Sequence, residues 1–73
     1  MSHRVRRMTA PELERLLAAH GFKFLVQRGC HRKWRHPETG LQAIIPHHKG
    51  LPIPIGTLLH ILKGAEIPRQ EWS

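Results

Sequence analysis

The sequence has little of what several protein classes need. Its 73 residues include one cysteine, Cys30, so a disulfide framework is excluded. Its longest apolar runs, such as residues 16–19, fall far short of the ~20 residues of a membrane-spanning helix. No apolar segment follows the basic first residues as it would in a secretory signal. We therefore expect one small cytoplasmic protein without a membrane partner.

Signatures of metal and cofactor chemistry are missing as well. The sequence contains neither a glycine-rich phosphate loop nor paired carboxylates, which argues against nucleotide hydrolysis and glycoside hydrolysis. His47 and His48 are adjacent, but no cysteine or carboxylate accompanies them at the spacing of a zinc site. We therefore predict no metal and no cofactor.

Acidic residues are also scarce. Twelve Lys and Arg residues stand against five Asp and Glu, which gives a net charge of +7 with the seven histidines neutral. Such an excess on a small chain attracts polyanions before any specific contact forms. Nucleic acid is the expected partner, although charge alone would also suit an anionic membrane surface or an acidic protein.

The first part of the chain indicates an arm and a helix. Residues 1–8 have no hydrophobic period and are predicted to form a basic flexible arm, followed by a single domain over 9–73. Thr9-Ala10-Pro11-Glu12 is typical of a capping box, which marks a helix start. The helix is predicted over 10–20, with its leucines buried and Glu14 on the polar side.

Period-two patterns predict a sheet in the middle of the chain. Strands are expected over 22–28, 30–36 and 41–45, with Phe24 and Val26 on one face of the first strand. The short turns between them force antiparallel neighbours, and a second helix is predicted to end near residue 65. The order α-β-β-β-α predicts an α+β fold with a three-stranded antiparallel sheet and two helices on one face. This is the general layout of the double-stranded-RNA-binding domain (dsRBD).

Alternation along the second strand separates two sets of side chains. Trp34 should face the helices, with Cys30 beside it as a small buried residue. His31, Lys33 and Arg35 then share the open face at steps of about 6.6 Å. An imidazole that carries protons and two cations that hold a phosphate suit phosphodiester chemistry. On spacing alone, ordinary solvent-facing surface is the preferred interpretation of these three polar residues.

Three more residues are candidates for RNA contacts. Arg28 precedes the first turn of the predicted sheet, and His48 and Lys49 follow its third strand. His48 is a candidate phosphate contact or second proton carrier. Cys30 and His31 are not expected to form a nucleophile and base pair, because adjacent strand residues point to opposite faces.

The run Gly29-Cys30-His31-Arg32-Lys33-Trp34-Arg35-His36-Pro37 resembles the HicA family of bacterial and archaeal toxins. That family has Gly-Ser-His, an aromatic residue three positions later and a His-Pro turn. Residues 16–22, 45–48 and 56–63 resemble, in order, its first helix, its Pro-x-His strand end and its Gly-Thr-Leu-x-x-Ile-Leu helix. The sequence departs from the family at Cys30, which replaces the usual Ser, and at the apolar Leu51-Pro52-Ile53-Pro54.

The resemblance implies a dsRBD-like ribonuclease that cleaves mRNA and is held inactive by a HicB antitoxin. The catalytic histidine of the family corresponds to His31. We therefore predict a metal-independent endoribonuclease toxin, in which the 2′-hydroxyl of RNA attacks the neighbouring phosphate. Two alternatives stay open: a non-catalytic RNA-binding module, and a helix-turn-helix DNA binder over 56–72, which the apolar second helix disfavours.

Overall fold

Local signals set the ends of the elements. The computed structural model describes residues 5–73. Its elements are α1 (Ala10–Ala19), β1 (Lys23–Arg28), β2 (His31–Arg35), β3 (Gln42–Pro46), α2 (Ile55–Gly64) and a final 3-10 turn, η1 (Arg69–Glu71). The predicted order and fold class are confirmed, and each predicted helix or strand end lies within about one residue of the observed one.

The capping box and the glycine stop of α1 are both present. The backbone N–H and the Oγ1 hydroxyl of Thr9 donate to Glu12 Oε1, at 2.8 and 2.9 Å. At the other end Gly21 has a φ of +92°, and the N–H of Phe22 donates to the Leu17 carbonyl at 3.0 Å. A Cβ on Gly21 would lie 2.7 Å from His36 Nε2, so this position requires glycine for space as well as for conformation.

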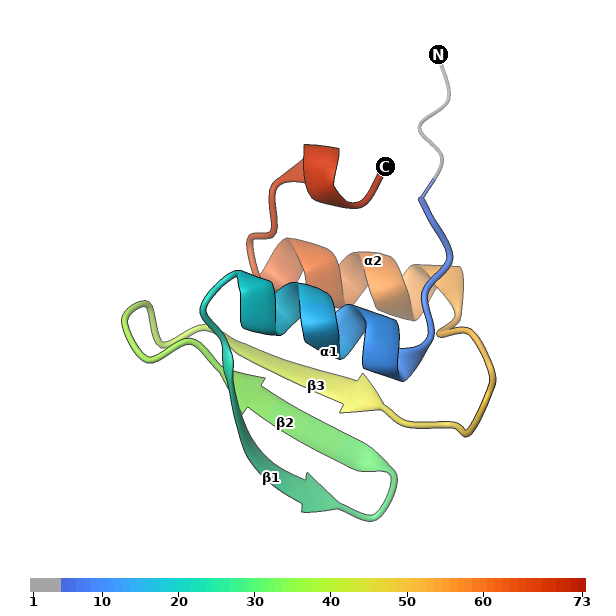
Figure 1. Ribbon diagram of the computed structural model, residues 1–73, viewed down its shortest axis with the longest axis horizontal. Helices are drawn as coiled ribbons and strands as arrows, with labels where there is room; N and C mark the ends of the chain where they lie inside the picture. The colour runs from blue at the N-terminus through green and yellow to red at the C-terminus, as the bar shows by residue number, and fades with distance from the viewer. Residues whose placement is uncertain (1–4) are drawn as a thin grey trace.

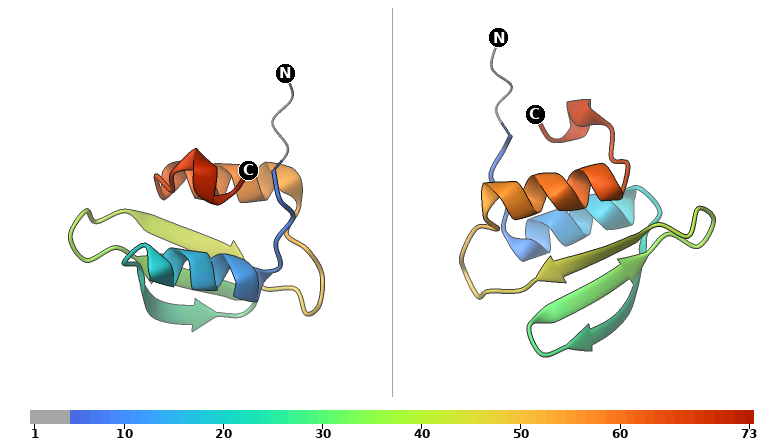
Figure 2. Two further views of the ribbon diagram at one scale, coloured as in Figure 1. Left: turned by 45° about the horizontal axis from the view of Figure 1, so that its top comes forward. Right: turned by 180° about the vertical axis from the view of Figure 1, so that it is seen from behind.

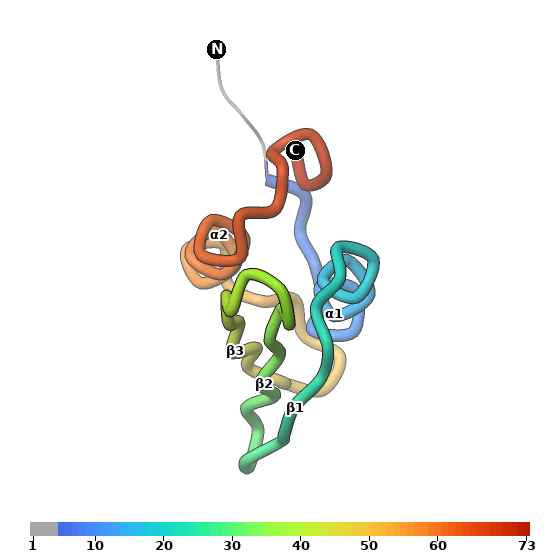
Figure 3. Tube along the Cα trace, turned by 90° about the vertical axis from the view of Figure 1, so that its left-hand side faces the viewer, coloured from blue at the N-terminus to red at the C-terminus, as the bar shows by residue number. Residues whose placement is uncertain are grey.

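The two helices form one layer and the sheet forms the other. The strands pair in the order β1-β2-β3, and both pairs are antiparallel. Both helices cover the same face of this sheet in every view (Figures 1 and 2), and the end-on view shows no described element over the other face (Figure 3). β1 extends beyond the helix layer, and all its residues are exposed.

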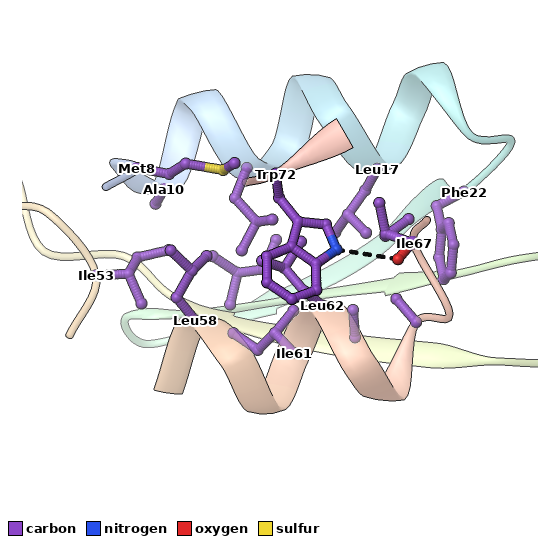
Figure 4. Packing of buried hydrophobic residues seen from close by; sticks show 14 residues of the cluster. Met8, Ala10, Leu17, Phe22, Ile53, Leu58, Ile61, Leu62, Ile67 and Trp72 are labelled. Carbon is purple, nitrogen blue, oxygen red and sulfur yellow. Dashed lines mark hydrogen bonds between the residues drawn. The ribbon is translucent and has the colours of Figure 1, made fainter. Parts of the chain in front are cut away.

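The hydrophobic core lies between the helices and the sheet. Its largest fully buried side chains are Leu13, Leu17, Ile45, Leu58 and Leu62. The indole of Trp72 lies between α1 and α2 and donates from Nε1 to the Ile67 carbonyl at 3.0 Å (Figure 4). Trp72 is therefore a core residue.

The segment before α1 is joined to the loop before α2. The N–H of Ile53 donates to the Met8 carbonyl at 2.8 Å, and both side chains are buried in the core. The apolar departure from the family's linker thus supplies a core residue. Residues 1–4 of the expected flexible arm lie outside the described residues, whereas the N–H of Arg6 donates to the Trp72 carbonyl at 3.1 Å.

A β-bulge changes the faces of β1. Phe24 pairs with Trp34, whereas Val26 pairs with Lys33, so Leu25 is an extra residue between two adjacent pairs. The prediction that Phe24 and Val26 share a face is therefore wrong. Phe24 lies on the helix side of the sheet beside Trp34, with ring centroids 5.9 Å apart, and Val26 lies on the open side.

The capping box predicts a pH-dependent contribution to stability. The hydrogen bond from the backbone N–H of Thr9, followed by that from its hydroxyl, lowers the pKa of Glu12 below its ordinary value of 4.5. A lowered pKa stabilises the fold fully above pH 4.5, and this stabilisation is lost as the pH falls through the lower, folded value. In thermal unfolding, Glu12→Ala should therefore have a lower Tm than the wild type at pH 7. This difference in Tm should shrink as the pH falls below 4.5. Glu38→Gln, in the β2–β3 turn, is the control, and a difference that grows with acid would contradict the account.

Candidate functional site

The side chains of β2 divide between the two faces of the sheet. Trp34 packs against the core, and its Nε1 donates to Glu14 Oε2 of α1 at 2.7 Å. The Nε of Arg32 donates to the same oxygen. Arg32 and Trp34 thus face the helices, while His31 and Lys33 point to the open face, as the alternation predicts.

The charge of Arg32 is engaged on the helix side. Its Cζ lies 4.4 Å from the centroid of the Phe24 ring, a cation–π distance. Its Nη1 donates to Gln27 Oε1 at 2.9 Å, in addition to the ion pair with Glu14. Arg32 therefore serves the fold, and the candidate binding groups of this strand are those on the opposite face.

The open face carries a shallow hollow next to His31. The hollow measures about 250 Å³, and its lining consists of Val26, Arg28, His31, Lys33 and Ile44. These residues come from all three strands and lie in two neighbouring rows, because Val26 and Ile44 both pair with Lys33, and Arg28 pairs with His31. The bulge at Leu25 leaves Val26 and Arg28 on this face, so three basic side chains meet here.

The other candidate residues lie outside the hollow. Arg35 is exposed at the far end of β2, where its Nη2 would be 3.7 Å from a Cβ on Gly40 in the β2–β3 turn. His48 and Lys49 are exposed in the loop after β3. That loop begins at the His31 end of the sheet, because Pro46, the last residue of β3, pairs with His31. Of the sequence candidates, the structure therefore groups His31 with Lys33 and Arg28.

The prediction of a buried Cys30 is wrong. Arg28 pairs directly with His31, so Gly29 and Cys30 form the connection between β1 and β2, and β2 begins one residue later than expected. Gly29 has a φ of +57°, and the Cys30 side chain is exposed. The replacement of the family's serine therefore lies on the surface beside His31 and does not alter the packing of the core.

Glu14 is the residue that the sequence analysis missed. The helical pattern assigns it to the polar side of α1, yet the structure leaves it only 9% exposed. Besides Arg32 and Trp34, its carboxylate faces His47, whose Nε2 lies 3.6 Å from Oε1. Two signals pointed to it: Glu14 lies at helical spacing from the buried Leu17, and an arginine facing the core requires an anionic partner.

The described residues contain neither a cluster of metal ligands nor a membrane-spanning helix. Within residues 5–73, no three His, Cys, Asp or Glu side chains are grouped so that they could hold a metal ion. In the same part of the chain, no helix has both the length and the apolar character that crossing a membrane requires.

A family model for the HicA toxin of bacterial toxin–antitoxin systems matches residues 10–67. The chain belongs to the HicA toxin family. The matched range includes all the elements from α1 to α2 and all the candidate residues. Membership of the HicA family assigns a toxin role and implies an antitoxin as partner. Among curated proteins no match is found.

The Glu14 contacts generate a stability prediction. Glu14→Gln keeps the size of the side chain but leaves Arg32 without its counter-charge. Because hydrogen bonds to charged groups contribute roughly 1.5–3 kcal/mol, and Arg32 is partly exposed, we expect a loss of about 1–2 kcal/mol in urea unfolding. The double variant Glu14→Gln/Arg32→Gln should lose less than the sum of the two single variants. Strict additivity, or wild-type stability of Glu14→Gln, would show that the pair does not stabilise the fold.

Proposed function

We propose that the chain is an endoribonuclease that cleaves mRNA, with His31 as its proton carrier. The observation that carries this proposal is the hollow in which one exposed imidazole adjoins the side chains of Arg28 and Lys33. The two cations bind the non-bridging oxygens of a phosphate and offset the negative charge that develops on it. The imidazole lies within the same hollow, where it can exchange a proton with the reacting oxygens.

In the proposed reaction the RNA supplies its own nucleophile. The 2′-hydroxyl loses a proton and its oxygen bonds to the neighbouring phosphorus, while the bond from phosphorus to the 5′-oxygen of the next nucleotide breaks. That leaving oxygen gains a proton, so proton and charge balance over the step. His31 accepts the first proton or donates the second. In this scheme Arg28 and Lys33 supply the positive charge, so no metal ion takes part.

The environments of two other histidines support the choice of His31. His47 faces the Glu14 carboxylate on the helix side. His36 Nδ1 accepts the N–H groups of Glu38 and Thr39, at 3.2 and 3.3 Å, and thereby shapes the β2–β3 turn. His31 is exposed and lines the cationic hollow.

The distribution of charge supports a polyanionic substrate on this face. All five carboxylates of the chain lie outside the strands, at positions 12, 14, 38, 66 and 71. The strands carry five Lys or Arg residues, of which Arg32 alone is paired with Glu14. We propose that Arg35 and Lys49, with His48, bind phosphates that flank the one held at His31.

The same surface suits control by an antitoxin. We propose that the antitoxin is of the HicB type, acts in the cytoplasm where mRNA is translated, and covers His31 with acidic groups. An acidic partner would meet the basic sheet rapidly, because opposite charges steer the encounter. The antitoxin would thus exclude mRNA by occupying its binding site.

The catalytic proposal predicts the behaviour of His31→Ala. Removal of a proton carrier typically slows a reaction ~10²–10⁴-fold, whereas an exposed residue contributes little to the fold. Purified His31→Ala should therefore unfold like the wild type, bind RNA nearly as well and cleave a labelled mRNA at least about a hundredfold more slowly. His60→Ala, exposed on α2, is the control, and EDTA should leave wild-type cleavage unchanged.

Two results would contradict this proposal. Full cleavage by His31→Ala would place the reaction elsewhere on the molecule. Tight binding without cleavage by any variant, the wild type included, would identify a non-catalytic RNA-binding module.

The binding surface predicts a specific salt dependence. On a single strand, log Kobs should fall with log salt by about 0.7 for each phosphate that a cation neutralises. Lys33→Ala and Arg28→Ala should each reduce this slope by about 0.7, as measured by fluorescence anisotropy with a labelled RNA. Lys63→Ala removes the same charge from the exposed end of α2 and should leave the slope unchanged. Equal effects of all three variants would mean that attraction is unspecific and not centred on the hollow.

A further inference from the structure

The hollow beside His31 has an aliphatic part that phosphate chemistry does not explain. Val26 and Ile44 are 40% and 53% exposed, although both are large apolar side chains. They flank Lys33 from the two neighbouring strands, so one row of the open face reads Val26, Lys33, Ile44. The next row contains Arg28 and His31. An aliphatic row therefore lies one step of about 6.6 Å along the sheet from the proposed reacting phosphate.

An aliphatic surface of this size suits a flat heterocycle. Phosphate and ribose hydroxyls are polar and gain nothing from contact with methyl groups, whereas the face of a nucleobase is apolar. Drug-sized ligands occupy pockets of ~300–1,000 Å³. At about 250 Å³ and open to solvent, this hollow is of a size for one base and not for a longer stretch of RNA. In the proposed function, the cations beside it hold the phosphate of the same nucleotide.

We propose that the hollow receives one unpaired base of the RNA, so that the enzyme cleaves single-stranded and not double-stranded RNA. This inference rests on the proposed ribonuclease function and adds its substrate class. In a duplex the face of each base is stacked on its neighbours, and the base reaches a protein surface only after it leaves the stack. Val26 and Ile44 contact that face without regard to the edge of the base, so the preference is for unpaired bases and not for one sequence.

The first part of the test compares three forms of one labelled RNA. The strand is offered alone, paired with its full complement, and paired with a complement that leaves a single nucleotide unpaired at the cleavage site. The wild type should cleave the free strand and the bulged duplex at similar rates and the full duplex at least about tenfold more slowly. Equal cleavage of all three forms would overturn the inference and leave the ribonuclease function intact.

The second part changes the aliphatic row itself. In Val26→Thr/Ile44→Thr both positions keep a β-branched side chain, which suits an exposed strand, but each replaces apolar surface with a hydroxyl. The double variant should bind the free strand about tenfold more weakly and raise KM by the same factor, with an unchanged unfolding transition. Leu25→Thr is the matched control, since Leu25 is 50% exposed on β1 but lies outside the hollow.

Binding to a 2′-O-methylated strand separates the two proposals. This probe lacks the free 2′-hydroxyl that the proposed reaction needs, so it is bound but not cleaved, and its affinity reports binding without chemistry. If the wild type cleaves no RNA but the double variant still binds the probe tenfold more weakly than Leu25→Thr, the ribonuclease proposal fails and the base-receiving hollow holds. If the double variant binds and cleaves as the wild type does, the inference is wrong. If the double variant cleaves RNA normally but is no longer inhibited by the antitoxin, the hollow receives an antitoxin side chain. That result would also overturn the inference that the hollow receives a base.

Discussion

One buried carboxylate connects the helix layer to the strand that carries the candidate site. Glu14 of α1 accepts from Arg32 and Trp34, which occupy the helix side of β2. Because neighbouring strand residues point in opposite directions, fixing these two side chains fixes the direction of His31 and Lys33 on the other side. The desolvation of the carboxylate is offset by these charge-assisted bonds, and no buried side-chain polar atom in the described residues lacks a partner.

The same arrangement sorts the charges of the domain. The ion pairs of the described residues join His20 to Glu71, and Arg32 and His47 to Glu14. These ion pairs all lie on the side of the sheet that the helices cover. Among the described residues, no ion pair involves Arg28, Lys33 or Arg35, so their positive charges add together on the open face. A fold of this size thereby separates residues that stabilise it from residues left free to bind.

The sequence was sufficient for the parts of the fold that depend on local chemistry. The capping box at Thr9 and the glycine at position 21 predict the two ends of α1 to within about one residue. Each of these signals acts through backbone groups only a few residues away. The alternation of β2 is regular, so the face of His31 followed from the position of Trp34. Family resemblance then pointed to the same histidine.

The errors came from contacts that no local pattern contains. Leu25 is apolar like its neighbours, and its extra position arises only from pairing with β2. Cys30 looked like the first residue of a strand until the direct pairing of Arg28 with His31 made it part of the turn. The burial of Glu14 depends on an arginine 18 residues away in the sequence. Arg28 and Val26 joined the site through that same irregular pairing, and neither could be assigned to it by alternation.

The bulge separates two parts of β1 whose side-chain directions are fixed independently of each other. The end of α1 determines which face of the sheet Phe24 lies on, and the short β1–β2 hairpin determines the face of Val26 and Arg28. If Leu25 were missing, Phe24 would still oppose Trp34, and Val26 would still oppose Lys33, now as regular neighbours in the ladder. Length variation by one residue at this point therefore leaves both faces of the sheet unchanged. A chain without the extra residue would present the same side chains on the open face, and an alignment that places its gap elsewhere in β1 would assign the wrong residue to the position of Arg28.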